Sequence, residues 1–222
     1  MRILRSLALA LVGLVAPFSR GAAQTCQGTA AFQDGRLRAG VFAHENRDVN
    51  DAGVSLAYGR PRSLYGEVSF DRLQASQGIS AASGGGLAIG YQLHLSDTPF
   101  QFCPEAMAHY SSSDGINTLE YGLGGNFGYR IGMSDWFTLV PATGIRWFTA
   151  TGMSDQLNVL SPGGGTTPAF ARGSGGEVRL EIGLVFNRSF TVVPGLLVPS
   201  QKGTKSIFTL GASINWANAV SR

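Results

Sequence analysis

Large apolar and polar side chains alternate along most of this chain after its first 23 residues. Residues 119–129, LEYGLGGNFGY, carry a large apolar residue at most odd positions and glycine or a polar residue between them. A period of two indicates β-strands, whereas a helix would repeat every 3.6 residues. We expect about ten strands from this pattern, at residues 34–44, 52–60, 63–73, 84–95, 99–110, 117–131, 136–150, 176–187, 189–199 and 205–216.

These segments are long, and the lengths of their expected connections alternate in a way that is typical of one architecture. Most have roughly 9–16 residues, near the 9–11 that a strand needs to cross a membrane. Short turns are expected at 61–62, 96–98, 132–135 and 188, and longer loops at 45–51, 74–83, 111–116 and 151–175. Short turns at one end and long loops at the other are typical of an outer-membrane barrel with extracellular loops. The sequence predicts an all-β, up-and-down antiparallel transmembrane barrel with ten strands; eight is the alternative count.

The aromatic residues of the apolar face are sorted along the expected barrel axis. One group falls at the short-turn end and a second at the long-loop end, with Leu, Val, Ile and Ala between them. The first group is Tyr58, Phe100, Tyr129, Phe137, Phe186, Phe190 and Trp216, and the second is Phe70, Tyr110, Tyr121, Trp147 and Phe208. Two aromatic girdles around an aliphatic band mark a surface that faces lipid. The alternative is a soluble barrel with the apolar face inside.

A proline lies at the same place in three of the expected strands. Each follows a phenylalanine by four positions, in the pairs Phe100/Pro104, Phe137/Pro141 and Phe190/Pro194. Proline cannot donate a hydrogen bond to a sheet ladder, so it is normally absent from central strands. We expect a repeated bulge or kink near the short-turn end; chance repetition among similar hairpins is the alternative.

The first 23 residues have the features of a secretory signal peptide. A basic start (MRILR), an apolar run (LALALVGLVAPF) and the small residues Gly21–Ala23 follow in order. We expect a signal peptide at 1–23, a periplasmic segment at 24–33 and the barrel at 34–222. Removing the signal peptide takes away Arg2, Arg5 and Arg20 and leaves 14 basic residues from 17, against 14 acidic ones. The charge therefore gives no reason to expect a nucleic-acid partner.

The signal peptide, the glycine- and aromatic-rich strands and the final amphipathic strand SIFTLGASINW resemble the small outer-membrane β-barrel proteins, the OmpA-like and OmpX-like barrels. The resemblance covers the mature chain and rests on pattern. It implies a bacterial outer-membrane location, insertion by the outer-membrane assembly machinery and a structural or surface-interaction role. We also expect a monomer in contact with outer-membrane lipid, without a cofactor. Family members usually end on an aromatic residue, whereas here Trp216 is followed by ANAVSR.

The two cysteines, Cys26 and Cys103, are candidates for a disulfide because an exported chain enters an oxidising compartment. The bond would fix the segment before the first strand at the periplasmic mouth. Two unlinked thiols are the alternative.

The polar face carries five charges of each sign. The residues are Arg36, Arg38, Arg130, Arg146, Arg179, Glu67, Glu105, Glu120, Glu177 and Glu181. A barrel of this size has little free space inside, and buried charges must be paired. We therefore expect a salt-bridged plug; a narrow polar pore or ligand site is the alternative.

Candidates for catalysis are few. His44, His94 and His109 have no metal-ligand spacing, so no metal site is expected. His109 and Ser111, with Glu120 on the next strand, are similar to the His/Ser/acid set of the outer-membrane lipid A deacylases, but the expected strand parity turns His109 inward. The loop expected at 151–175 is a candidate for recognition, or for a lid or disorder. The sequence favours a non-catalytic barrel, with a narrow-pore channel second and a lipid A-modifying hydrolase third.

Overall fold

The computed structural model describes residues 35–45, 49–60, 63–75, 81–94, 100–113, 116–158, 168–200 and 205–217 of the chain. The expected signal peptide at 1–23 and periplasmic segment at 24–33 lie outside these residues. Within them there is no helix long and apolar enough to cross a membrane.

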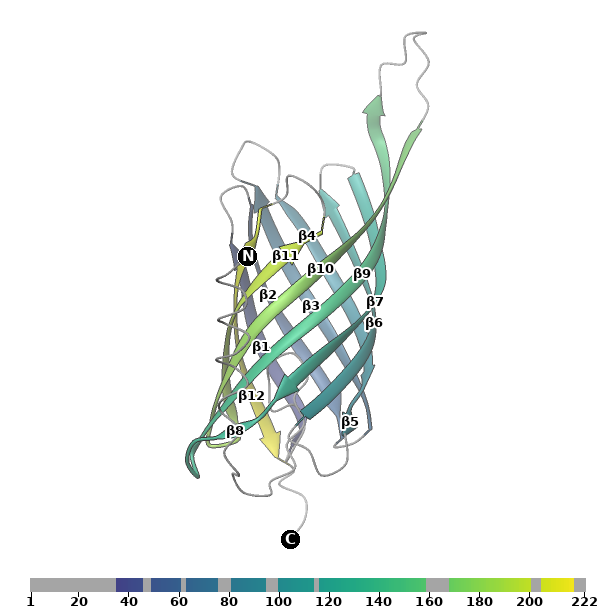
Figure 1. Ribbon diagram of the computed structural model, residues 1–222. Helices are drawn as coiled ribbons and strands as arrows, with labels where there is room; N and C mark the ends of the chain where they lie inside the picture. Colours follow the sequence, from purple (N-terminus) through teal and green to yellow (C-terminus); the bar gives the residue numbers. More distant parts are fainter. Residues whose placement is uncertain are drawn as a thin grey trace, which may run out of the picture.

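The described chain is built almost entirely of antiparallel strands (Figure 1). Their bounds are β1 (Gly35–Glu45), β2 (Val49–Gly59), β3 (Leu64–Ala75), β4 (Ala82–Tyr91), β5 (Leu93–His94), β6 (Phe100–Ser113), β7 (Ile116–Tyr129), β8 (Ile131–Gly132), β9 (Phe137–Asn158), β10 (Pro168–Phe186), β11 (Phe190–Pro199) and β12 (Ile207–Ala217). The two-residue strands β5 and β8 continue β4 and β7 past one residue that belongs to neither strand, Gln92 in the first case and Arg130 in the second. The wall therefore has ten strands.

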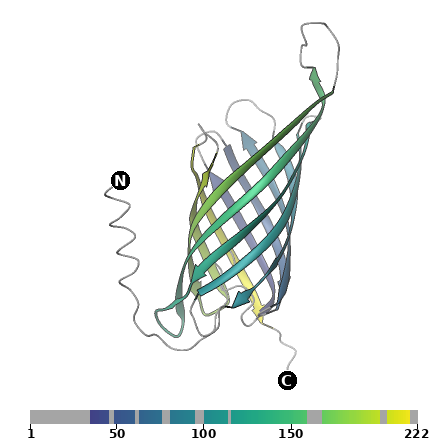
Figure 2. The same ribbon diagram turned by 45° about the vertical axis from the view of Figure 1, so that its right-hand side comes forward.

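Consecutive strands pair around a closed barrel. β1 pairs with β2 on one side and with β12 on the other, and β9 pairs with both β7 and β10. Closure leaves the wall without an open edge, so its backbone groups can be paired within the protein. The strands tilt around the axis, as the two views in Figures 1 and 2 show. The ten-stranded up-and-down barrel expected from the sequence is confirmed.

The expected difference in connection length between the two ends is largely wrong. Much of the segment expected as a loop at 151–175 is strand, because β9 runs to Asn158 and β10 begins at Pro168. The two strands form a ribbon that rises beyond the rest of the upper rim in Figure 1. Likewise β2 begins at Val49, and only residues 114–115 separate β6 from β7. Glycine, serine and threonine in these segments suggested loops, but the ladder of a neighbouring strand holds them extended.

Each of the three repeated prolines interrupts one ladder without moving its register. Pro104 lies between the pairs Gly90↔Glu105 and Leu93↔Phe102, and no pairing joins β6 to its neighbour between them. Pro141 leaves the same gap between β9 and the end of β7, and Pro194 leaves it between β11 and β10. The register continues unchanged past every gap, so the expected bulge is wrong. A missing N–H donor opens the ladder locally without inserting an extra residue into the strand.

Candidate functional site

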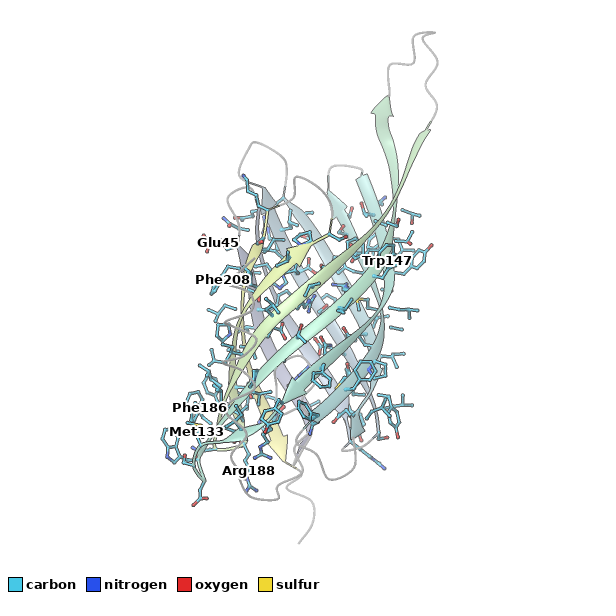
Figure 3. The ribbon with its side chains drawn as sticks, in the orientation of Figure 1. Glu45, Met133, Trp147, Phe186, Arg188 and Phe208 are labelled. Atoms are coloured by element: carbon cyan, nitrogen blue, oxygen red, sulfur yellow. The ribbon has the colours of Figure 1, made fainter. Side chains whose placement is uncertain are left out.

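The outer face of the barrel is apolar. Large side chains that point outward from the wall are exposed, among them Leu123 (69%), Ile145 (68%) and Leu87 (61%). Aromatic side chains lie toward both ends of this surface. Figure 3 shows Phe208 and Trp147 in the upper part of the barrel and Phe186 at the lower end. A continuous apolar belt of this kind is unfavourable in water and matches the hydrocarbon layer of a membrane.

The lower end carries a cluster of aromatic rings around one tight turn. Phe137, Phe186 and Phe190 belong to three strands, and ring centroids of Phe186 lie 5.3 Å from Phe137 and 6.1 Å from Phe190. Trp136 joins the cluster 6.2 Å from Phe186 and is 58% exposed. The turn between β10 and β11 has positive φ at two consecutive non-glycine residues, Asn187 (48°) and Arg188 (58°), the conformation of a type I′ hairpin turn. This turn brings Phe186 and Phe190 opposite each other.

Inside the barrel, the lower part of the lumen is filled. The inward side chains of Gln92, Gln101, Cys103, Val140 and Thr191 are at most 1% exposed. They come from β6, β9 and β11 and from the single residue between β4 and β5. Together they close the lumen between the lower rim and the charged layer above it.

The charged layer consists of carboxylates held by arginines and one tyrosine. Arg38 pairs with Glu67 across the β1–β3 region of the wall. The hydroxyl of Tyr65, a residue that is 2% exposed, donates to Glu105 Oε2 at 3.0 Å. The sequence analysis did not select Tyr65, although its parity with Glu67 on β3 points it inward. The ring has room because glycine, Gly90, stands opposite it on β4.

A second set of charges lies on β7, β9 and β10. Arg146 donates to Glu120 Oε1 at 3.2 Å and to Glu177 Oε1 at 3.3 Å, and so joins strands on both sides of β9. Arg179 reaches the same Glu177 oxygen at 3.2 Å. Such buried pairs define which groups meet but add little net stability, because both ions lose hydration.

Above the buried layer is a cavity of about 510 Å³ that reaches toward the upper ends of the strands. Its lining includes seven carboxyl groups and three guanidinium groups, an excess of four acidic groups. The carboxylates are Asp51, Glu67, Asp71, Glu105, Glu120, Glu177 and Glu181, and the arginines are Arg38, Arg146 and Arg179. Phe42, Met107 and Leu197 add apolar surface to the same cavity. The cavity is therefore more acidic than the equal charges of the sequence led us to expect.

Two histidine–aspartate pairs lie toward the upper end of this cavity. His44 Nδ1 is 3.1 Å from Asp51 Oδ2, and His109 Nε2 is 2.7 Å from Asp71 Oδ1. The second pair packs against Gly84, where an added Cβ would lie 2.7 Å from the His109 ring. Asp51 was missed because the strand was expected to begin at residue 52, just after it, whereas β2 begins at Val49. Asp71 was missed because its parity with Glu67 was not followed to the end of β3.

Three of the residues selected from the sequence lie elsewhere or cannot be placed. Arg130 lies between β7 and β8 and does not line the cavity. The side chain of Arg36 and the whole of Cys26 are outside the described residues, so the Cys26–Cys103 disulfide stays a prediction. Cys103 itself is 1% exposed on β6.

The candidate catalytic set is divided between different partners. His109 faces the lumen, Ser111 lines the same cavity, and Glu120 is paired with Arg146 rather than with His109. The acid that contacts His109 is Asp71. No group of three or more His, Cys, Asp or Glu side chains with metal-binding geometry occurs within the described parts of the barrel.

Comparison with known proteins gives a likeness of fold. The sequence matches no protein-family model and no curated protein. The β domain of the Bordetella autotransporter BrkA superposes with a TM-score of 0.49 at 12% identity, covering 83% of this chain and 100% of that one. An outer-membrane channel from Pseudomonas putida F1 gives 0.48 at 10% identity, covering 90% and 100%. The N-terminal β-barrel domain of Pseudomonas aeruginosa OprF gives 0.38 at 9% identity, covering 82% and 98%.

These likenesses are too distant to carry an argument about activity, and the assignment rests on the chain's own surfaces. Strands enclose a lumen lined with charges, and the outward face is an apolar belt with aromatic residues toward its two ends. A soluble barrel would have these two faces reversed. The chain therefore has the fold of an outer-membrane β-barrel, as its sequence resemblance implied.

Proposed function

We propose that this protein is a non-catalytic outer-membrane barrel with a structural or surface-interaction role. The observation that carries the proposal is the closed lower lumen. Side chains from three strands and from the residue between β4 and β5 fill it, and their exposed fractions are at most 1%. A wall closed in this way provides a rigid support for the β9–β10 ribbon, the segment that extends farthest from the upper rim. Extensions on rigid barrels are common places for recognition.

A narrow-pore channel is the second candidate, and the acidic cavity favours it. Ion passage would require the buried layer around Gln92, Gln101 and Thr191 to open. We expect purified, refolded protein in planar bilayers to show no unitary conductance in 1 M KCl. A matched sample of the double variant Gln101→Gly and Thr191→Gly tests whether the buried layer is what blocks the passage of ions. Steady unitary conductance of the wild-type barrel would contradict the structural proposal and favour the channel.

A lipid A-modifying hydrolase is the third candidate, and the placement of His109 argues against it. Its ring faces the lumen and contacts Asp71, whereas lipid A would lie against the outer face. We expect cells carrying His109→Ala or Ser111→Ala to have the same lipid A acylation as cells with the wild-type protein. A change in acylation with a normally folded variant, judged by heat-dependent gel migration, would establish catalysis instead.

The orientation of the barrel and its processing are part of the proposal. We propose that residues 1–23 are removed, that Cys26 and Cys103 form a disulfide, and that the β9–β10 ribbon faces the cell exterior. The assembly machinery would insert the chain as a monomer in contact with outer-membrane lipid. A cysteine-free variant with a single cysteine in residues 159–167 should react with an impermeant maleimide on intact cells. Labelling only after cell lysis would show that the barrel has the opposite orientation, with the ribbon facing the cell interior.

A further inference from the structure

The cavity contains one carboxylate that differs from the others. Glu67, Glu120 and Glu177 pair with arginines, Asp51 and Asp71 with histidines, and Glu105 accepts from Tyr65. Within the described part of the barrel, Glu181 makes no direct hydrogen bond or ion pair, and the positive charge that attracts it most is Arg179, two residues before it on β10. It is partly buried on the lumen side of β10, where it packs beside Gly195 of β11. A carboxylate inside a protein without a direct ion pair is only partly compensated by a more distant charge, so a cation in contact with it would be stabilised.

The wall of the cavity indicates what kind of cation would fit. The volume of about 510 Å³ is in the range of sites for small organic molecules, roughly 300–1,000 Å³. Phe42, Met107 and Leu197 provide apolar and aromatic surface in the same space as the carboxylates. An inorganic ion would use only the charges, whereas an organic ammonium compound would also bury its carbon atoms against these side chains.

We propose that the cavity is a binding site for a small organic cation, with Glu181 as the anionic group that holds its ammonium. The excess of carboxylates attracts cations into the cavity, and the same field excludes anions. The filled layer below makes the site a closed pocket with its entrance toward the upper end. The proposal does not depend on whether the barrel has a structural role, because it concerns the occupancy of the lumen alone.

The test uses the purified mature protein in detergent and three probes of similar shape: phenethylammonium, 2-phenylethanol and phenylacetate. Isothermal titration should show saturable binding of phenethylammonium with one site per barrel. Phenylethanol should bind at least about tenfold more weakly, because it lacks the charge, and phenylacetate should not bind. Equal binding of the three probes would overturn the proposal, because detergent or the outer face would then be the binder.

Two variants locate the site. Glu181→Gln keeps the side-chain shape and removes the charge, and should weaken phenethylammonium binding about tenfold or more. Glu45→Gln removes a carboxylate from an exposed, outward position at the upper end of β1 and should leave binding unchanged. Heat-dependent gel migration checks that both barrels are folded. Unchanged binding by a folded Glu181→Gln variant would overturn the proposal, as would displacement of the organic probe by equimolar Ca²⁺.

Discussion

At the scale of single residues, glycine determines which large side chains can occupy the lumen. Inward-facing glycines stand beside bulky groups on the neighbouring strand, as Gly90 does for Tyr65 and Gly84 for the His109–Asp71 pair. Glycine normally weakens a strand because it has no side chain to pack. Here the missing Cβ provides the volume for a ring or an ion pair, which explains part of the high glycine content of 31 residues.

Gly84→Ala should therefore destabilise the barrel by about 1–3 kcal/mol, since the new Cβ would force His109 away from Asp71. Urea unfolding in detergent, followed by tryptophan fluorescence, measures the difference. Gly132→Ala is the matched control, because a Cβ at Gly132 would have no atom within 4 Å. Equal stability of the two variants would show that the His109–Asp71 pair can move without lowering the free energy of unfolding.

The same scale shows how far the sequence predicts the lumen. Strict alternation was enough to predict that Arg38, Glu105 and Arg146 face inward, because one face of each strand is plainly apolar. It could not show which charges meet, since pairing depends on the register between strands and on the barrel's tilt. Asp51 was placed in a loop because Asn and Asp favour turns. Its position in β2 is decided by pairing with His44 on the neighbouring strand.

At the scale of strands, each of the three prolines weakens the pairing between two particular neighbouring strands. Opposite each proline, a carbonyl of the neighbouring strand has lost its ladder donor; for Pro194 the residue opposite, by continuation of the register, is Ile182. The same strand pairs normally on its other side, where Pro194 is opposite Leu210. The loss of hydrogen bonding is therefore confined to one side of the strand that contains the proline.

Replacing Pro194 by valine should close this gap and stabilise the barrel by about 0.5–1.5 kcal/mol, the net value of one hydrogen bond. Pro199→Val is the control, because Pro199 ends β11 at a pair with Glu177 where the ladder is uninterrupted. Both changes loosen the unfolded chain equally, so the difference between their urea midpoints isolates the ladder bond. A Pro194→Val variant less stable than Pro199→Val would contradict this account.

At the scale of the whole molecule, the outward surface forms an apolar belt that matches the hydrocarbon layer of a membrane. Its most exposed members, such as Leu123 and Ile145, lie in the middle of long strands, whereas Met133 lies at the lower end. The belt was predictable from sequence because the same parity repeats in every strand. The ribbon of β9 and β10 was not, because its composition resembles a loop and only its partner strand holds it extended.

Leu123→Arg should destabilise the barrel in bilayers by about 1–3 kcal/mol, since the charge would lie on the lipid-facing surface between the two aromatic groups, just below Tyr121. Met133→Arg, at the lower end, should change stability by only about 0–1 kcal/mol. Unfolding from lipid vesicles in guanidinium chloride compares the two. Similar effects in both positions would mean that the lipid boundary does not follow the aromatic residues.

The proline gaps also divide the barrel into units. They fall between β4 and β6, β7 and β9, and β10 and β11, whereas β6–β7, β9–β10 and β11–β12 pair without these gaps. Each gap thus separates one hairpin from the hairpin before it, at the lower end. The wall therefore consists of fully paired hairpins, and the pairing between one hairpin and the next is weaker at each proline gap. Amide hydrogen exchange would begin at these gaps, and stepwise addition of whole hairpins is the assembly order that breaks the fewest strong contacts.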